Sequence, residues 1–509
     1  MSRNRIIKNV GFLYLKMGIT ILLSLYTTRI VLKALGDVDF GIYNVIAGAI
    51  ILLGFINNSM SPVTQRFMSV CEGEANFEKK CKVFNASILL HCIIASIICL
   101  IFILFGSLLF DQILNIPTEK LPAAKIIYIG LIISTLFTII SVPYEAAINS
   151  HEDLGYYAII GILETLLRLI IAIIIMNCNT DRLIIYGTLM PTVTIISLVI
   201  MRIHCIKKYP ECKINIRKYK DTEILKDISR ISSWNLLGVS SSMAGYYGGN
   251  IILNHYFGAA INSATAVASQ INSQLLSLTN NMLKAVNPVI AIKVGEGNVE
   301  SFTSLSLKTC KFSYYLLAIL AIPCIIKAED LLSFWLGDIP DWAMCFTRLL
   351  IIKSLIEQTT LPLGTSILAI GRISKYNIIN FAINIAPIAF SIIIFTTDKR
   401  PDVLYWLQIL FYGLASCLLR VGYISRISSI KYIDYLKTVL YPIIIVTTLS
   451  LIFCALITII IDNAFVQLLL MVILTAAAIL FAGLDVQERN NLIVLFGKSS
   501  RYWKNKLQK

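Results

Sequence analysis

The sequence predicts an all-α, polytopic membrane protein with about fourteen transmembrane helices. Of its 509 residues, 57% are hydrophobic and only 14% are charged, whereas a soluble globular chain carries roughly 25% charged residues. Apolar runs of about 20 residues, the length needed to cross a bilayer, alternate with short polar clusters along the whole chain. No small-residue cleavage site follows the first run, so we expect a membrane helix there and not a cleaved signal peptide.

Fourteen apolar runs are long enough to be spans. By the length rule they fall at roughly 8–34, 42–66, 83–110, 123–149, 157–177, 183–205, 231–256, 264–292, 303–327, 343–370, 375–396, 402–425, 438–461 and 464–485. Lys and Arg gather in alternate connections, above all in the longest one, 206–230, and in the C-terminal tail. Because cytoplasmic loops carry the excess of basic residues, this pattern predicts that both termini are cytoplasmic.

Composition and motifs argue against several other classes of protein. The net charge of +15 lies in short loops and at the termini, where it fixes membrane orientation, so we expect no nucleic-acid partner. The twelve cysteines form no CxxC pair, and the four histidines lack metal-ligand spacing, so no metal site and no cofactor is expected. The chain has no GxxxxGK[ST] phosphate loop. We therefore expect a protein that is not an enzyme.

An internal repeat divides the chain. Gly73–Glu78 recurs as Gly295–Glu300, an offset of 222 residues, and Pro143 pairs with Pro362 at an offset of 219. Each copy holds six predicted helices, an even number, so the copies share one topology, as in transporters built from parallel repeats. This predicts an N-terminal lobe, a basic linker, a C-terminal lobe, and two extra helices with a basic tail: 1–205, 206–230, 231–425 and 426–509.

Ionisable residues inside the predicted spans are the candidate functional groups, because charges are costly in hydrocarbon and usually face a cavity or a partner. Lys284 is the strongest, since it lies deep in a polar segment that contains Pro288. Glu164 and Arg168 are four residues apart, which suits an ion pair along one helix. The remaining candidates are Arg29, Lys33, Arg66, Glu145 and Glu357.

Each of these residues also has a structural interpretation. Arg29 and Lys33 can extend to the membrane interface, and Arg66 lies near a helix end, where interfacial anchoring is the default. The stretch Ser240–Asn250 is rich in Ser and Gly, which fits either close helix packing or a bend between conformational states. The sequence does not choose between these alternatives.

The segment Arg29–Tyr43 resembles the end of the first helix in Wzx-type polysaccharide flippases, in which an Arg, a Leu-Gly and a Phe/Tyr-Gly-Ile-Tyr recur in this order. Pro362–Tyr376 is similar to the proline-to-glycine tenth helix of that family. Asn287-Pro288 and the following Gly295–Asn298 are similar to its eighth helix and exit. The resemblance covers essentially the whole chain and extends to related multidrug exporters.

Membership of the multidrug/oligosaccharidyl-lipid/polysaccharide exporter superfamily would imply two six-helix lobes around a central cavity that opens alternately to each side. The Wzx branch moves undecaprenyl-diphosphate-linked oligosaccharides across the bacterial inner membrane for O-antigen-type surface polysaccharides. By position, Arg29, Arg66 and Lys284 would meet the diphosphate, with Lys33 beside them. Partners would be the lipid-linked oligosaccharide, membrane lipids and other polysaccharide assembly proteins.

The ion-coupling site is left open by the sequence. Many relatives carry an aspartate where this chain has Asn250, so Glu145, Glu164 and Glu357 are the candidates to bind H⁺ or Na⁺. Two other functions are alternatives to the flippase. A multidrug or cation antiporter of the same superfamily would need a cavity rich in carboxylates and aromatic residues. A membrane-embedded glycan polymerase or ligase would need a large extracytoplasmic loop, which the chain lacks.

Overall fold

The computed structural model describes residues 3–52, 55–108, 110, 118–178, 181–257, 260–336, 339–397 and 400–490, and these ranges contain helices and turns but no strand. The α-helices are α1 (Arg3–Leu52), α2 (Phe55–Gly73), α3 (Phe77–Leu108), α4 (Leu121–Ser150), α5 (Leu154–Asn177), α6 (Arg182–Lys208), α7 (Ile216–Tyr219), α8 (Thr222–Phe257), α9 (Ala260–Gly295), α10 (Val299–Ile326), α11 (Ala328–Leu336), α12 (Ala343–Gln358), α13 (Leu361–Ile370), α14 (Ser374–Phe395), α15 (Val403–Gln408), α16 (Ser416–Ile427), α17 (Tyr432–Tyr435), α18 (Tyr441–Ile460) and α19 (Ala464–Ala478). Nine helical segments in the described ranges are long and apolar enough to cross a membrane. The chain is therefore a polytopic all-α membrane protein, as its sequence predicts.

The described residues of the fourteen predicted spans are mainly helical, with local differences in how the helices are joined. The first span and the start of the second lie in α1, which is interrupted at Gly36 with φ of 73° and ψ of 173°, and the rest of the second span lies in α2. Glycine suits this position because it adopts positive φ without steric cost. Arg182 donates a hydrogen bond of 3.0 Å to the carbonyl of Ala34, and Lys120 forms a 2.9 Å ion pair with Asp39. These two contacts stabilise the backbone on either side of the kink at Gly36.

Four predicted spans contain breaks or π-helical turns. The tenth is divided into α12 and α13 by Thr359 and Thr360, and Pro362 stands in the first turn of α13, where its missing N–H costs nothing. The π-helices η4 (Ile409–Ala415) and η5 (Leu436–Leu440) interrupt the twelfth and thirteenth spans, and η6 (Ile479–Gly483) ends the fourteenth. Such π-turns are rare and often occur at functional sites.

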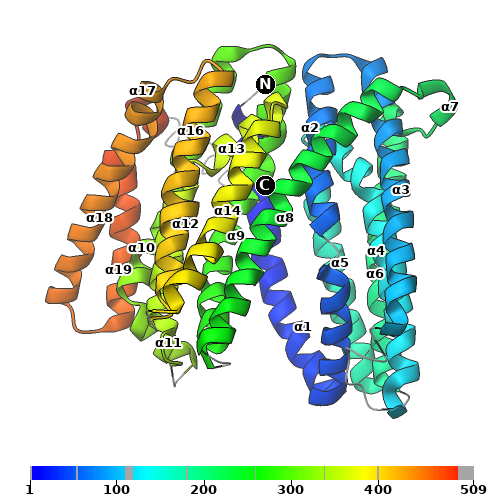
Figure 1. Ribbon diagram of the computed structural model, residues 1–509, viewed down its shortest axis with the longest axis horizontal. Coiled ribbons are helices and arrows are strands. Elements are labelled where there is room, and N and C mark those ends of the chain that lie inside the picture. The colour runs from blue at the N-terminus through cyan, green and yellow to red at the C-terminus, as the bar shows by residue number, and fades with distance from the viewer. Residues whose placement is uncertain are drawn as a thin grey trace, which may run out of the picture. The chain divides into compact units, whose positions relative to one another are not determined.

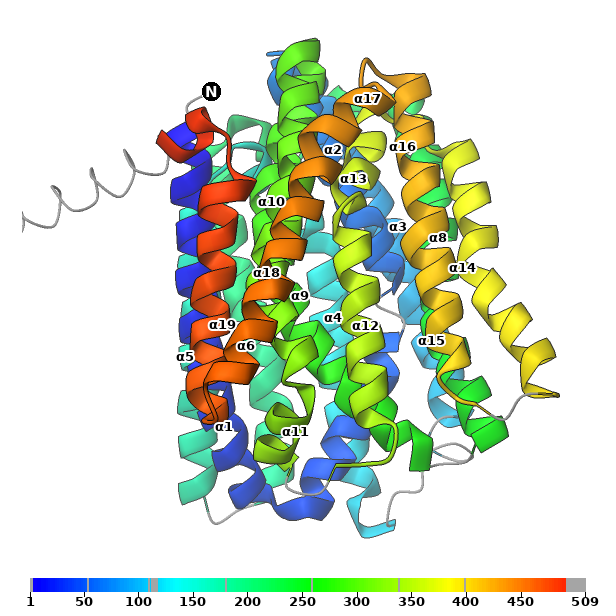
Figure 2. The ribbon, with the colours of Figure 1, turned by 90° about the vertical axis from the view of Figure 1, so that its left-hand side faces the viewer.

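The described chain forms two compact units. The first unit comprises Met1–Ser240, Lys284–Phe302 and Leu368–Ile378, and the second comprises Ser241–Leu283, Thr303–Ile367 and Ile379–Lys509. In the first unit α1 packs along α5, and α4 packs along α6 and α2 (Figure 1). In the second unit α18 and α19 form an antiparallel hairpin (Figure 2). The predicted boundaries follow the sequence repeat, whereas these units follow spatial contacts, which join 284–302 and 368–378 to the first unit.

The two repeat segments adopt the same backbone conformation. The N–H of Glu74 bonds to Val70 O at 2.9 Å, and the equivalent Glu296 bonds to Ile292 O at 2.9 Å. Ala75 and Gly297, which are also equivalent, both have positive φ, at 51° and 65°. The repeat read from the sequence therefore corresponds to one helix–turn–helix geometry that occurs twice.

The ends of α2 and α9 cross at a pair of equivalent glycines in the first unit. A Cβ on Gly73 would lie 2.0 Å from the carbonyl oxygen of Ile292, and a Cβ on Gly295 would lie 2.1 Å from that of Val70. The contact is reciprocal, because Val70 and Ile292 are equivalent in the repeat as well. Only glycine lets the two backbones approach this closely.

The basic segment 206–230 packs against the helices of the first unit. Glu211 and Cys212 are buried, and the N–H of Asn215 donates to Asn85 Oδ1 on α3 at 2.8 Å. Lys80 of α3 forms ion pairs with Glu211 at 2.8 Å and with Glu72 at 2.5 Å. The linker therefore belongs to the packed structure of this unit.

Candidate functional site

The strongest sequence candidate, Lys284, is part of an ion pair between two helices of the first unit. Its Nζ lies 2.8 Å from Glu145 Oε1 on α4, and each side chain is 29% exposed. The same Nζ lies 3.8 Å from the centre of the Tyr157 ring on α5. Pro288, four residues further along α9, leaves the carbonyl of Lys284 without its helical N–H partner, which makes this part of the helix more polar.

A second lysine, Lys16 of α1, approaches the same tyrosine. Its Nζ lies 4.2 Å from the centre of the Tyr157 ring. Gly161, one turn along α5, makes room for it, because a Cβ there would lie 2.2 Å from Lys16 Cε. Lys16 is within electrostatic range of both Lys284 and Glu145. We call Lys16, Glu145, Tyr157 and Lys284 the two-lysine cluster.

The two-lysine cluster is built from four helices whose packing is apolar next to the charges. Leu13, Leu154 and Ala285 form a buried group against which Tyr157 packs. Each of these residues lies within three positions of Lys16, Tyr157 or Lys284 in the sequence. The apolar faces of α1, α5 and α9 thereby fix the backbone positions from which the lysines and the tyrosine project.

The predicted ion pair on α5 is confirmed. Arg168 Nη2 lies 2.6 Å from Glu164 Oε1, and it also donates to Thr194 Oγ1 on α6 at 3.2 Å. Glu164 is within electrostatic range of Lys16, so this pair borders the two-lysine cluster. Of the three predicted coupling carboxylates, Glu145 and Glu164 therefore belong to one charged region of the first unit.

Arg66, a predicted ligand of the substrate diphosphate, bonds to the backbone at the end of another helix. Its guanidinium donates to the carbonyls of Ala369 at 2.9 Å and Ile370 at 3.2 Å, at the C-terminal end of α13. A cation at a helix C-terminus satisfies carbonyls that lack helical partners and is favoured by the helix dipole. This geometry supports the structural interpretation of Arg66, whose hydrogen bonds and ring contact among the described residues lie outside the two-lysine cluster.

The other predicted cations of the first helix are less defined by the structure. Arg29 lies in α1, but its side chain is outside those that the structure describes. Lys33 is exposed. Their predicted roles at the substrate diphosphate stay predictions.

Glu357 and all but the first residue of the Ser/Gly-rich segment lie in the second unit. Glu357 of α12 is within electrostatic range of Tyr412 in η4. A Cβ on Gly245 of α8 would lie 2.3 Å from the Tyr412 hydroxyl, and Asn384 donates to Ser241 at 2.8 Å and Ser242 at 3.0 Å. The segment is continuous within α8, and these contacts show that it packs closely against its neighbours.

The chemistry available at the two-lysine cluster is the binding of an anion. Two lysines face one carboxylate of the cluster, and the neighbouring Glu164 already has Arg168 as its partner, so the region has a cationic surplus of one. An ammonium group meets a phosphate oxygen as a point charge with up to three donors. Within the described ranges, no group of three or more His, Cys, Asp or Glu side chains could hold a metal ion.

Sequence reasoning missed Lys16 and the aromatic platform between the lysines. Lys16 lies inside the predicted span 8–34, so the rule that led to Lys284 applies to it as well. Tyr157 carries no such signal, because an isolated tyrosine near a helix start is usual at a membrane interface. Only the packing of α1, α5 and α9 brings these side chains together.

The comparisons with known proteins agree with this architecture. No protein-family model matches the chain. The uncharacterized membrane protein EpsK of Bacillus subtilis (strain 168) is 21% identical over 434 residues, which cover 83% of this chain and 84% of that protein.

Two solved structures show the fold. An outward-facing multidrug resistance MATE family transporter of the MOP superfamily superposes with a TM-score of 0.71 at 17% identity, covering 84% of this chain and 96% of that one. A MOP superfamily transporter from Pyrococcus furiosus Vc1 (DSM3638) superposes with a TM-score of 0.65 at 15% identity, covering 82% and 95%. This chain therefore has the fold of the MATE family transporters of the MOP superfamily.

Proposed function

We propose that this protein is a flippase that moves an undecaprenyl-diphosphate-linked oligosaccharide across the bacterial inner membrane by alternating access. The observation that carries the proposal is the two-lysine cluster. Lys16 and Lys284 come from α1 and α9, helices that belong to the two different repeats, and they meet at one tyrosine ring. A diphosphate that crosses apolar lipid needs its charge met by protein groups, and this cluster offers two cations.

The polarity of α9 supports a hydrophilic path. The predicted span that contains Lys284, the eighth, is not among the nine segments of the described residues that are apolar enough to be membrane spans. Polar residues in transmembrane helices face protein or a water-filled path. Helix α9 is therefore suited to line the route of a charged substrate.

In this proposal Glu145 is the internal counter-ion of Lys284. With no substrate bound, the 2.8 Å ion pair neutralises both groups. A diphosphate that approaches Lys284 competes with the carboxylate, and the released Glu145 is then available to bind H⁺ or Na⁺. Glu164 keeps its ion pair with Arg168 and contributes a negative electrostatic potential at Lys16.

A multidrug or cation antiporter is the second candidate. It is favoured by the fold, which is that of a multidrug resistance transporter, and by the carboxylates Glu145, Glu164 and Glu357. A cationic drug would use the carboxylates directly and would be repelled by the lysines. For the Pyrococcus furiosus protein of this fold, reverse polarity of the binding pocket suggests a different function, so the sign of the charge separates the two candidates.

Transport in reconstituted vesicles tests the proposal. We expect Lys284→Ala to reduce the movement of a lipid-linked oligosaccharide about tenfold or more, the equivalent of one lost charge-assisted hydrogen bond. Lys284→Arg should retain part of the activity, and Lys308→Ala, which removes an exposed lysine on α10, should retain all of it. Since Lys284→Ala leaves Glu145 unpaired, Lys284→Met combined with Glu145→Gln controls for stability and should fold normally but stay inactive.

Two outcomes would overturn the flippase. One is undiminished oligosaccharide movement by the double variant in correctly folded protein. The other is efflux of a cationic drug that needs Glu145 but is indifferent to Lys284, which would favour the antiporter.

A further inference from the structure

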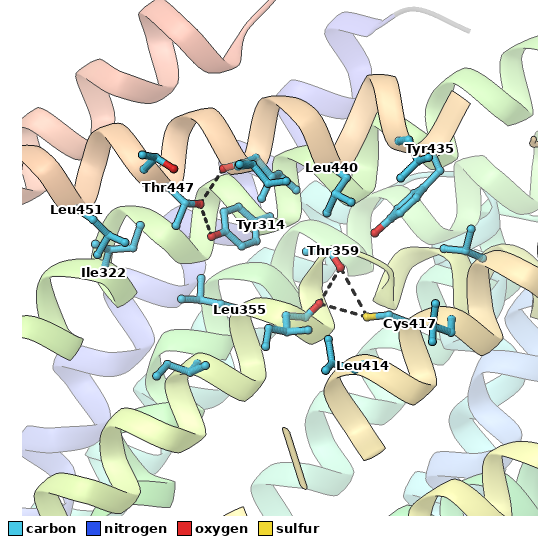
Figure 3. A pocket seen from close by; sticks show the side chains of 18 of the residues that line it. Tyr314, Ile322, Leu355, Thr359, Leu414, Cys417, Tyr435, Leu440, Thr447 and Leu451 are labelled. Atoms are coloured by element: carbon cyan, nitrogen blue, oxygen red, sulfur yellow. Dashed lines mark hydrogen bonds between the residues drawn. The ribbon is translucent and has the colours of Figure 1, made fainter. Parts of the chain in front are cut away.

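The second unit contains an apolar cavity of about 860 Å³ that is separate from the two-lysine cluster. Its walls come from α10, α12, η4 with α16, and α17 with η5 and α18. Figure 3 shows Ile322, Leu355, Leu414, Leu440 and Leu451 around the space between these helices. We call this cavity the α12–α18 slot.

The α12–α18 slot opens on the apolar side of its helices. Among its lining residues, Leu418 is 75% exposed, Ile444 is 54% exposed and Leu451 is 48% exposed. They lie in two of the membrane-spanning segments, Val403–Ile427 and Tyr432–Ile460. A cavity that opens at the apolar surface of such segments faces hydrocarbon, so its occupant comes from the bilayer.

Three of the polar side chains in the walls are already bonded within the protein. The Tyr314 hydroxyl lies 2.6 Å from Thr447 Oγ1, and Thr447 donates to the carbonyl of Ile443 at 2.7 Å. Thr359 donates to the carbonyl of Ile356 at 2.7 Å and lies 3.7 Å from Cys417 Sγ. Figure 3 shows both groups at the wall of the slot. A polar ligand would gain little here, whereas a hydrocarbon chain leaves no hydrogen bond unmade.

The slot is elongated along the membrane-crossing direction of one segment. Its lining residues on that segment run from Tyr432 to Leu451, which corresponds to about 28 Å along a helix. The hydrocarbon core of a bilayer is about 30 Å thick. The slot therefore has the length for an extended acyl chain that starts at the interface near Tyr432.

Basic residues flank that end of the slot. Lys431 precedes the lining residue Tyr432, and Lys437 follows the lining residue Leu436; both lysines are exposed. Lysines next to a hydrocarbon site match a phosphate headgroup. We propose that the α12–α18 slot binds one acyl chain of an anionic phospholipid, with the headgroup phosphate held by Lys431 and Lys437. This site does not depend on the flippase activity proposed above.

Photo-crosslinking in nanodiscs tests the site, with a phosphatidylglycerol that carries a diazirine in its acyl chain as the probe. Mass spectrometry should find crosslinks concentrated on slot residues of α16 and α18. Ile444→Trp, which fills the slot, should remove them, whereas Ile459→Trp should not, because Ile459 lies on the same helix, is 80% exposed and does not line the slot. The preference for phosphatidylglycerol over phosphatidylcholine should fall about fivefold for each of Lys431→Ala and Lys437→Ala, the fold-change that corresponds to ~1 kcal/mol per cation.

Native mass spectrometry of the two lysine variants gives an independent measurement if Ile444→Trp does not fold, because both replace exposed side chains. They should retain fewer bound phosphatidylglycerol molecules than the unsubstituted protein. Crosslinks spread evenly over the lipid-facing surface would overturn the site. So would labelling by a photoreactive polyprenyl diphosphate that phosphatidylglycerol does not compete away.

Discussion

At the scale of single residues, the first unit contains ion pairs in two different environments. Lys284 and Glu145 pair inside membrane helices, where a lone charge is costly. His151, Lys80, Glu72 and Glu211 pair outside them, where α2, α3 and the segment after α6 meet. The first pair is suited to exchange partners with a substrate. The second group joins the 206–230 segment to the helices.

The net charge of the second group depends on the protonation of His151. His151 Nε2 lies 2.6 Å from Glu211 and Nδ1 lies 3.5 Å from Glu72, and the ring stacks on Tyr209 at 4.1 Å. Burial disfavours the charged ring, but the hydrogen bonds to Glu211 and Glu72 outweigh it and raise the pKa of His151 above its ordinary value. Charged His151 and Lys80 then balance the two carboxylates.

The first prediction concerns pH and His151. Because the pKa of His151 is raised by folding, its stabilisation is fully present below the ordinary histidine pKa of about 6.5 and is lost as the pH rises through the folded value. Thermal unfolding in detergent should therefore show a melting temperature that falls from pH 6 to pH 9. His151→Gln should flatten this dependence and His255→Gln, at an exposed position, should not. Equal slopes in all three proteins would contradict it.

The two carboxylates of the same group, Glu72 and Glu211, determine the lowest pH at which the group stabilises the folded protein. Hydrogen bonds from His151 and the charge of Lys80 lower the pKa of Glu72 to about 2, against the effect of burial. For Glu211, burial is opposed by hydrogen bonds from His151 and Lys80, which lower the pKa to about 2. Lowered carboxylate values contribute stability above the ordinary pKa, and this is lost as the pH falls through the folded value. The group is thus most stable in mildly acidic solution.

At the scale of helices, the crossing of α2 and α9 is a contact that a single added methyl group would disturb. Each glycine faces a backbone carbonyl of the other helix at 2.0 or 2.1 Å from its would-be Cβ. Backbone atoms cannot rotate away as a side chain can. An added methyl group must therefore separate the helix ends.

The second prediction is that Gly73→Ala and Gly295→Ala each destabilise the protein by about 1–3 kcal/mol, the usual cost of overpacking. Thermal unfolding of the purified variants measures this. Gly18→Ala is the matched control, because nothing lies within 4 Å of a Cβ at that helical position. The double variant should cost less than the sum of the two, since one separation of the helices relieves both clashes. Full additivity would show that the sites are independent.

At the scale of the whole chain, the fourteen predicted spans and the alternation of basic charge between their loops predict an orientation in the membrane. The turn with Glu78 and the segment 206–230 should be cytoplasmic, and the connection that contains α11 should lie on the opposite side. The alternation is a property of loops that are hydrophilic and short, so it does not depend on how the two units are arranged.

The third prediction tests this orientation with cysteine labelling. Glu78→Cys and Phe334→Cys both place a thiol at an exposed position, since the Glu78 side chain is 74% exposed and Phe334 is 93% exposed. In sealed cells a membrane-impermeant maleimide should label Phe334→Cys and leave Glu78→Cys unlabelled until the cells are opened. The unsubstituted chain gives the background of its native cysteines. The reverse pattern would invert the predicted topology.

The sequence by itself determined the class of fold, the repeat and the ion pair of Glu164 with Arg168. The class of fold and the ion pair follow from hydropathy and from a spacing of four residues along one helix, which are local properties.

Only the tertiary structure decided the partners of isolated charges. It joined Lys284 to Glu145, 139 residues away, placed Lys16 on Tyr157, and directed Arg66 to the end of α13, 303 residues away. It also formed the α12–α18 slot from helices that read as ordinary apolar spans. Such long-range contacts depend on which helices pack together, and the apolar runs that make helices pack are too similar to one another for the sequence to specify the pairs.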